Sequence, residues 1–195
     1  MSKPKIAVII SSIRDNRFGA KPAEWIYNLA QQRDDLEVEI VDLKTFDLPM
    51  FNEPASDAWA PATNPEAIRW QKKIAEFDGY IFVTAEYNRS ITGALKNAID
   101  HAYVAWNRKA AAYVGYGSVG GARAVEHLRT ISVELQMVPV RAGVHIGGSE
   151  FFNVWMQGKP FEDILPVIEP SAKDMLDQLT WWTKATKTAR EATAA

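Results

Sequence analysis

Residues 80–100 read YIFVTAEYNRSITGALKNAID, and the stretch changes character twice along its length. It opens with the apolar run Tyr80–Val83, whose aromatic and β-branched residues are typical of a buried strand. A polar loop follows from Thr84 to Ser90, and after Gly93 apolar residues recur with the spacing of one helix face. Open α/β sheets bind their ligands at such strand–loop–helix junctions. The stretch therefore predicts an α/β protein with a ligand site at this loop.

The same alternation of strand and helix runs along the rest of the chain. Further strands are predicted at Lys5–Ser11, Glu37–Leu43, Lys109–Tyr116 and Val138–Ile146. Further helices are predicted with Pro22 in a first turn, at Pro65–Phe77, at Ala122–Met137 and at Ser171–Lys187. The connections 44–63 and 147–166 are predicted to be irregular. This pattern indicates a doubly wound, five-stranded parallel sheet of order 2-1-3-4-5, with helices on both faces in three α/β/α layers.

Composition restricts the class of protein. The 195 residues, 47% hydrophobic and 24% charged, suit one well-buried domain over residues 1–195. A net charge of -2 lacks the basic excess of nucleic-acid-binding surfaces. The absence of cysteine excludes thiolate chemistry, and the three histidines show no metal-ligand spacing, so we expect no metal. The apolar run Ile6–Ile10 is too short for a signal peptide, and no run approaches the ~18 residues of a membrane helix, so we expect a cytoplasmic protein without a membrane partner.

Three polar loops follow the strands whose carboxyl ends form the ligand crevice in this topology. The first loop carries hydroxyl and guanidinium groups just ahead of a helix, and these suit a phosphate: Ser11, Ser12, Arg14, Asn16 and Arg17. The second loop offers Glu86, Tyr87 and Asn88, so that a planar heterocycle can stack on the tyrosine. In the third loop, Gly117–Gly121 lets the backbone approach a flat ligand closely.

Each loop also has a purely structural interpretation. The first can be a solvated loop whose serine caps the helix, and the second a turn in which Asn88 or Ser90 caps the next helix. The third can be an ordinary glycine turn. The first loop contains neither the P-loop motif nor G-x-G-x-x-G, so we expect no nucleoside triphosphate or Rossmann dinucleotide site there. Ser118 lacks the G-x-S-x-G context of a hydrolase nucleophile, because Tyr116 stands at its first position.

Residues 85–100, AEYNRSITGALKNAID, resemble P-E-Y-N-x-S-x-P-G-x-L-K-N-A-I-D of the NADPH-dependent FMN reductase family, which includes quinone, chromate and azo-dye reductases. They differ from it only at Ala85 and Thr92. The first loop resembles the family's G-S-x-R-x-x-S-x-N, with Ser12 and Arg14 matching and Arg17 in place of the second serine. The third loop resembles G-x-S-x-G-G-x-x-A, and residues 48–53 resemble L-P-x-[FY]-N-[ED]. The resemblance spans residues 5–148.

The resemblance implies a flavodoxin-like protein that binds FMN and takes hydride from NADPH or NADH. Reduced flavin would then pass electrons to an acceptor such as a quinone, another flavin, a metal oxyanion or an azo compound. Implied phosphate ligands are Ser12, Arg14 and Arg17. The wider set implied to bind the cofactor adds Phe18, Ala85, Glu86, Tyr87, Asn88, Tyr116, Ser118, Gly120 and Gly121. No side chain is implied as a catalytic acid or base, since the flavin carries the chemistry.

Two other classes remain open, namely a non-catalytic flavodoxin-type electron carrier and a flavin-binding or flavin-free scaffold that keeps the fold for partner interactions. The charge of -2 disfavours the carrier, because such proteins are typically strongly acidic. The resemblance further implies a homo-oligomer, a dimer or a tetramer, with residues 44–63 and the helix after Gly93 at its interface. One of Trp59, Trp106 and Trp155 is a candidate to cover the flavin, and Trp181-Trp182 are expected to be core or interface anchors.

Overall fold

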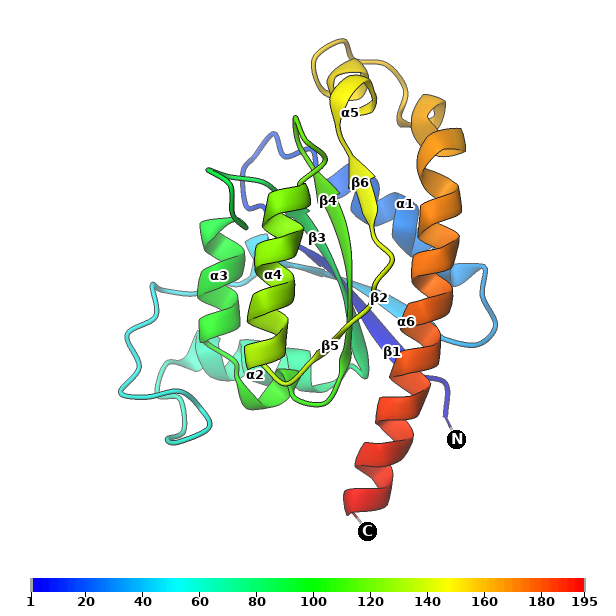
Figure 1. Ribbon diagram of the computed structural model, residues 1–195. Helices are drawn as coiled ribbons and strands as arrows, with labels where there is room; N and C mark the ends of the chain where they lie inside the picture. The colour runs from blue at the N-terminus through cyan, green and yellow to red at the C-terminus, as the bar shows by residue number, and fades with distance from the viewer. Residues whose placement is uncertain (1, 195) are drawn as a thin grey trace.

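The computed structural model describes residues 2–194. A central parallel sheet crosses the molecule with helices packed on both of its faces (Figure 1). Its strands are β1 (Lys5–Ile10), β2 (Glu37–Asp42), β3 (Gly79–Ala85), β4 (Ala110–Tyr116), β5 (Val138–Pro139) and β6 (Val144–Ile146). The order β2-β1-β3-β4-β5 confirms the predicted topology, and β2 is the edge strand that its alternating pattern indicated.

The predicted fifth strand is interrupted, because residues 138–146 form two short strands that both pair with β4. Side chains satisfy the backbone of the intervening segment. Arg129 donates to the carbonyl oxygens of Val140 and Arg141, and the amide oxygen of Gln178 accepts a hydrogen bond from the Ala142 N–H at 3.0 Å. These contacts replace sheet hydrogen bonds, so the backbone can leave the ladder without burying unpaired polar groups.

The alternation of side chains along the strands divides the core into two halves. Ile6 and Val8 of β1 pack with α1 (Ala20–Gln31) and α6 (Leu165–Ala194) on one face. Ala7 and Ile9 pack on the other face, which is covered by α2 (Pro65–Ala75), α3 (Gly93–Asp100) and α4 (Ala122–Glu134). The predicted three-layer arrangement is therefore confirmed. Short 3₁₀ turns lie at Leu43–Thr45 and Val104–Trp106.

Helices α2 and α3 both begin at a side-chain cap, and the cap of α3 differs from the residues that the sequence suggested. The side chain of Asn64 accepts hydrogen bonds from the backbone N–H groups of Glu66 and Ala67, as its place before Pro65 indicated. Helix α3 is capped by Thr92, whose Oγ1 accepts from the Leu95 N–H at 3.1 Å. The alternative in which Asn88 or Ser90 caps this helix is therefore wrong, because the backbone turns back at those residues before the helix begins.

The segment 147–166 was predicted to be irregular, and this prediction was wrong. It contains α5 (Gly148–Trp155), the 3₁₀ turn Phe161–Ile164 and the first residues of α6. Helix α6 begins at Leu165, ahead of the predicted start at Ser171, and includes Pro170. The missing N–H of that proline is tolerated because α6 buries a long apolar stripe against the sheet: Ile168, Ala172, Met175, Leu176 and Leu179.

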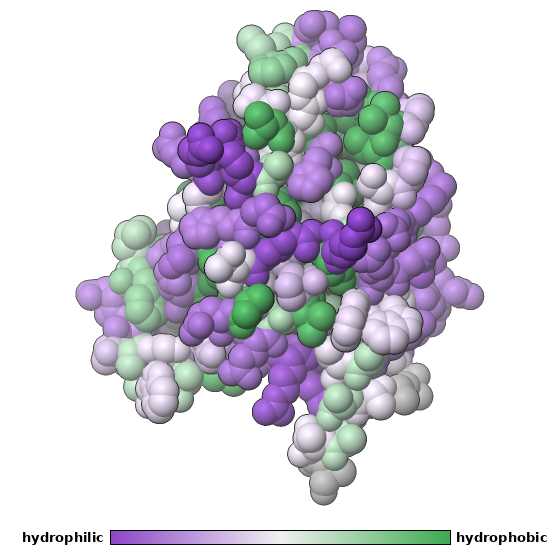
Figure 2. Space-filling view, viewed as in Figure 1, coloured by the Kyte–Doolittle hydropathy of each residue, from purple (hydrophilic) through white to green (hydrophobic). Residues whose placement is uncertain are grey.

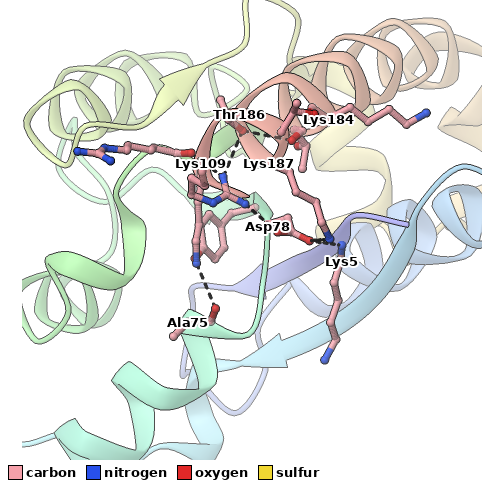
Figure 3. A network of polar contacts seen from close by, with 12 residues as sticks. Lys5, Ala75, Asp78, Lys109, Lys184, Thr186 and Lys187 are labelled. Atoms are coloured by element: carbon pink, nitrogen blue, oxygen red, sulfur yellow. Dashed lines mark hydrogen bonds and ion pairs between the residues drawn. The ribbon is translucent and has the colours of Figure 1, made fainter. Parts of the chain in front are cut away.

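The far end of α6 is bound to the amino-terminal edge of the sheet (Figure 3). Lys187 and Arg190 donate to the Asp78 carboxylate at 2.8 and 2.7 Å, and the Lys5 N–H donates to it at 3.0 Å. Burial alone would raise the pKa of Asp78, but these donors outweigh it and hold the pKa below its usual value. Nearby, the buried ammonium of Lys109 donates to Ala75 O at 3.3 Å, at the carboxyl end of α2. No helix among residues 2–194 is both long and apolar enough to cross a membrane.

Candidate functional site

A cavity of about 120 Å³ lies where the first and second loops meet the end of β4 and helix α5. Eight residues that the sequence analysis assigned to cofactor binding line it: Ser12, Arg14, Arg17, Phe18, Ala85, Glu86, Tyr87 and Tyr116. The four others, Asn88, Ser118, Gly120 and Gly121, are outside its lining. Four further residues complete it: Asn16, Gly117, Phe151 and Trp155. The structure thus brings together most of the predicted site and adds a wall from α5.

Hydroxyl groups converge on one side of the cavity. Ser12 Oγ lies 3.1 Å from the Tyr87 hydroxyl, so the first and second loops are in direct contact. Burial raises the pKa of Tyr116 well above its ordinary value, with the neighbouring Tyr87 adding to this effect and a hydrogen bond with Ser12 opposing it. Tyr116 therefore remains protonated in the physiological range. Thr92 adds a second link between the loops, since its Oγ1 donates to Ser11 O at 2.9 Å.

The two arginines of the first loop have different surroundings. Arg17 forms a bidentate ion pair with Asp42 at the end of β2, and its Nη1 also donates to Ser12 O at 2.9 Å. The hydrogen bond with Asp42 raises the pKa of Arg17, although burial opposes it. Arg14 is exposed and has no hydrogen-bond or ion-pair partner among the described residues that could compete for its guanidinium. Arg14 is thus free to bind an anion, whereas Arg17 braces the loop.

Helix α1 begins beside these arginines with its first N–H groups lacking a side-chain cap. Its N-terminal cap is Gly19, and no acidic residue occupies its first turn. Glycine is required there, because a Cβ at position 19 would lie 2.5 Å from the Tyr116 hydroxyl oxygen. An uncapped helix N-terminus carries a partial positive charge. In this first turn Lys21 N already donates to Phe18 O at 3.1 Å and Pro22 has no N–H, so the partial charge is the main contribution of the helix. Together with Arg14 and Ser12 it forms a donor set suited to a phosphate group.

The second loop is a tight hairpin turn. Tyr87 and Ser90 exchange two backbone hydrogen bonds, of 2.9 and 3.1 Å, around Asn88 and Arg89, which have φ angles of 50° and 68°. Such left-handed pairs form type I′ turns, where asparagine is favoured first and glycine second. Arg89 therefore holds a conformation that is costly for a residue with a Cβ. The turn explains why Asn88 is exposed and lies outside the cavity.

Glu86 joins the second loop to the third. Its side chain is buried and accepts a hydrogen bond from the Arg123 N–H at 3.1 Å, in the first turn of α4, while also pairing with the Arg123 guanidinium. The carboxylate thus satisfies the start of α4, whose cap residue Gly121 offers no side chain. Gly121 has φ 66°, and a Cβ on it would lie 2.7 Å from Tyr116 N. Gly121 is accordingly needed for close packing beneath the cavity.

Aromatic rings form the remaining wall. Phe18 lies 5.1 Å from both Tyr116 and Phe151, and Phe151 is nearly parallel to Trp155 at 6.2 Å between ring centroids. Of the three tryptophans considered from sequence, Trp155 is the one at the cavity. Trp106 is fully buried in the core, and Trp59 is 86% exposed. Residues 151 and 155 stand at i, i+4 spacing, a signal that the prediction of an irregular segment missed.

The other features noted in the sequence take no part in the cavity. Trp181 and Trp182 are 63% and 40% exposed and form an edge-to-face pair on α6, so they are not core residues, and the other half of the expectation, that they anchor an interface, stays a prediction. Among residues 2–194, no group of three or more histidine or carboxylate side chains is placed to hold a metal ion.

The donors and rings of the cavity fit FMN. A phosphate finds the free Arg14, the Ser12 hydroxyl and the start of α1, while the ring of Tyr87 suits a flavin. The hydroxyl of Ser11, the residue before Ser12, is buried without a hydrogen-bond partner among the described residues, so the first loop contains an unused donor. Over residues 4–150 the sequence matches the family model described as NADPH-dependent FMN reductase. The chain belongs to this family.

Proteins similar to this chain are named for the same chemistry. An NAD(P)H-dependent FMN reductase, ntnL, of a Nectria species is 35% identical over 89% of this chain and 98% of its own length. A quinone reductase of Pseudomonas putida is 36% identical over 74% of this chain and 78% of its own. The solved structure of FerB, a flavoenzyme NAD(P)H:(acceptor) oxidoreductase from Paracoccus denitrificans, superposes with a TM-score of 0.69 at 24% identity, covering 94% of this chain and 98% of FerB. Family membership makes the chain a flavin-dependent oxidoreductase with FMN and NAD(P)H as cofactors, and FerB supports the fold.

Proposed function

We propose that the chain passes reducing equivalents from NAD(P)H through bound FMN to a small acceptor, of which a quinone is the leading candidate. The observation that carries this proposal is the convergence of the predicted phosphate and ring loops on one cavity at the carboxyl edge of the sheet. When bound, FMN supplies the hydride and electron transfer chemistry. Other acceptors that suit the same chemistry are free flavins, metal oxyanions and azo compounds.

We propose that some residues of the site bind FMN directly and that others hold the binding loops in position. Ser12, Arg14 and the start of α1 are proposed to hold the phosphate, with Arg17 aligning the loop through Asp42. The backbone of Ala85–Tyr87 and the ring of Tyr87 are proposed to meet the flavin. For Glu86 we propose a positioning role, because its carboxylate is already used by Arg123. No side chain is assigned as a catalytic acid or base.

The size of the cavity limits what it holds. Ligand pockets commonly enclose roughly 300–1,000 Å³, whereas this cavity measures about 120 Å³. We propose that it receives the phosphate end of FMN, and that the flavin ring rests on the second loop towards the third, where Asn88, Ser118, Gly120 and Gly121 lie. In this arrangement one face of the ring stays accessible, as an enzyme must allow if nicotinamide and acceptor are to bind in turn.

We further propose that the enzyme is a homo-oligomer, a dimer or a tetramer, in the cytoplasm, where NAD(P)H is available. A groove of about 920 Å³ runs between the 44–63 connection, α3 and the end of α4. Apolar side chains that line this groove are exposed, with Val104 at 53% and Trp59 at 86%. A second copy covering this groove would bury them. A monodisperse monomer in light scattering at micromolar concentration would refute this part of the proposal.

A reduction experiment separates the proposed function from its rivals. The purified protein is loaded with FMN, its visible spectrum is recorded, and NADPH or NADH is added under nitrogen. The enzyme is expected to be yellow, to bleach with one nicotinamide, and to regain its colour when a quinone is added. A yellow protein that neither nicotinamide reduces would favour the electron carrier, and a protein unable to bind FMN would favour the scaffold.

A further inference from the structure

Helix α5 supplies the one wall of the cavity that lies outside the three cofactor loops. Phe151 and Trp155 both face the cavity, and their rings are within 10° of parallel. Phe18 connects them to the first loop, at 5.1 Å from Phe151 and 6.3 Å from Trp155. These two side chains therefore border the space where the cofactor loops meet.

The helix is only lightly attached to the rest of the protein. Val154 is its single buried residue. The backbone of α5 contacts the third loop through Gly148 N, which donates to Ser118 O at 3.1 Å. The end of the molecule where α5 lies shows apolar side chains at the surface among polar ones (Figures 1 and 2), and Phe152, Trp155 and Met156 are exposed. Val154 and the partly buried Phe151 attach the helix to the core along one side, and its other side is open to solvent.

Glycines lie at both ends of α5. Gly147 precedes the helix, Gly148 is its first residue and Gly158 follows its last turn, with φ angles of 50° at Gly148 and 67° at Gly158. Nothing lies within 4 Å of where a Cβ on Gly158 would stand, so packing does not require that glycine. Glycine instead gives the backbone freedom to change direction. Short segments that end in such residues commonly move as hinged units.

We propose that Phe151 and Trp155 contact the bound FMN and that α5 is a hinged wall which closes on it. This inference rests on the proposed function and deepens it. The aromatic pair adds apolar contact area and excludes water from the phosphate end of the site, so it slows release of the cofactor. Phe152 is the natural control, because it lies on the same helix, is 39% exposed and does not line the cavity.

The test measures FMN binding by four variants and the wild type. Flavin fluorescence is titrated with apoprotein, and the dissociation rate is measured after mixing the complex with excess competing apoprotein. Phe151→Ala and Trp155→Ala are each expected to raise the dissociation constant roughly tenfold, mainly through faster release. Phe152→Ala and Trp155→Phe are expected to stay within roughly threefold of the wild type.

Hydrogen exchange adds a readout that does not depend on substitution. FMN is expected to slow exchange of the amides of residues 148–156 in the wild type, with little change in the middle of α6. Wild-type protein that does not bind FMN would refute the proposed function. Wild-type protein that binds FMN while Phe151→Ala and Trp155→Ala bind it equally well would overturn this inference alone. The inference would also be overturned if Phe152→Ala weakened FMN binding as much as Phe151→Ala and Trp155→Ala, or if FMN did not change hydrogen exchange in α5.

Discussion

Lys109 gives the protein a dependence of stability on pH that can be measured directly. Lys109 is 7% exposed and its ammonium donates to Tyr80 Oη at 3.0 Å and to Ala75 O at 3.3 Å, with no ion pair to a carboxylate among residues 2–194 (Figure 3). Burial is the main cause that lowers the pKa of Lys109 from 10.5 to about 8, and the nearby charge of Arg190 adds to it. The folded protein thus disfavours the charged form of this lysine.

The sign of the effect follows from proton linkage. Below pH 8 both folded and unfolded states carry the charged lysine, so the folded state bears the full cost of burying it. Between pH 8 and 10.5 the unfolded state binds more protons, and stability rises with pH. For pKa values of 10.5 and about 8, the cost is about 3 kcal/mol at pH 7 and about 1 kcal/mol at pH 9.5, a gain of about 2 kcal/mol.

The perturbation is Lys109→Met, which keeps an unbranched chain and removes the titrating group. Urea unfolding of wild type and variant at pH 7 and 9.5, followed by circular dichroism, gives the free energy of unfolding of each. The wild type is expected to gain about 2 kcal/mol relative to the variant between the two pH values. Comparing the two proteins cancels the titration of other groups. The pH stays below 10 because tyrosines of the unfolded chain titrate near 10.0, whereas burial raises the pKa values of Tyr80 and Tyr113 in the folded protein, the latter to about 12. Above pH 10 this difference would add its own change to the free energy of unfolding.

Lys3→Met, which removes an exposed lysine, controls for the loss of a lysine as such. A wild-type-minus-variant difference that is the same at both pH values would refute the reasoning, since it would mean that Lys109 titrates alike in the folded and unfolded states.

Three further predictions concern the loops. Arg14→Gln is expected to weaken FMN binding by about 1.5–3 kcal/mol in fluorescence titrations, because a charge-assisted hydrogen bond to phosphate is lost, whereas Arg17→Gln should mainly lower the melting temperature by leaving Asp42 unpaired. Equal FMN affinity of Arg14→Gln and the wild type would rule out Arg14 as a phosphate ligand. Arg89→Gly is expected to stabilise the protein by up to about 1 kcal/mol in urea unfolding by relieving its left-handed backbone, and a loss of stability would contradict the type I′ turn. Thr92→Ala should cost about 1–2 kcal/mol through loss of the α3 cap, with Thr92→Ser retaining most of the stability; equal stabilities of these two variants would show that the hydroxyl contributes nothing.

The sheet could be predicted from sequence because β1, β3 and β4 are nearly unbroken apolar runs and β2 alternates polar and apolar residues as an edge strand does. The order of the strands followed from topology rules once the strands were counted. The interruption between β5 and β6 could not be predicted in this way. It depends on Arg129 and Gln178, which come from two helices and supply hydrogen bonds that local sequence does not show.

The candidate site was predictable where the residues belong to the loops that follow the strands. Eight of the assigned residues line one cavity because the carboxyl ends of parallel strands meet at one edge. Asn88 was assigned on its place in the motif, but the backbone of the turn directs it to the surface. Phe151 was missed, and Trp155 was only one of three candidate tryptophans, because Gly147 and Gly148 suggested a loop and the short helix has no long periodic pattern.

The family match ends at residue 150, whereas the core does not. Ile168, Met175 and Leu179 of α6 lie against the sheet face that holds Ile6 and Val8, and the helix ends in the charged contacts around Asp78. A fragment cut to the recognised segment would keep every cofactor loop and yet leave that face open to water. The segment that matches the family model and the segment able to fold are therefore different lengths of chain, and expression of an isolated reductase domain has to include the final helix.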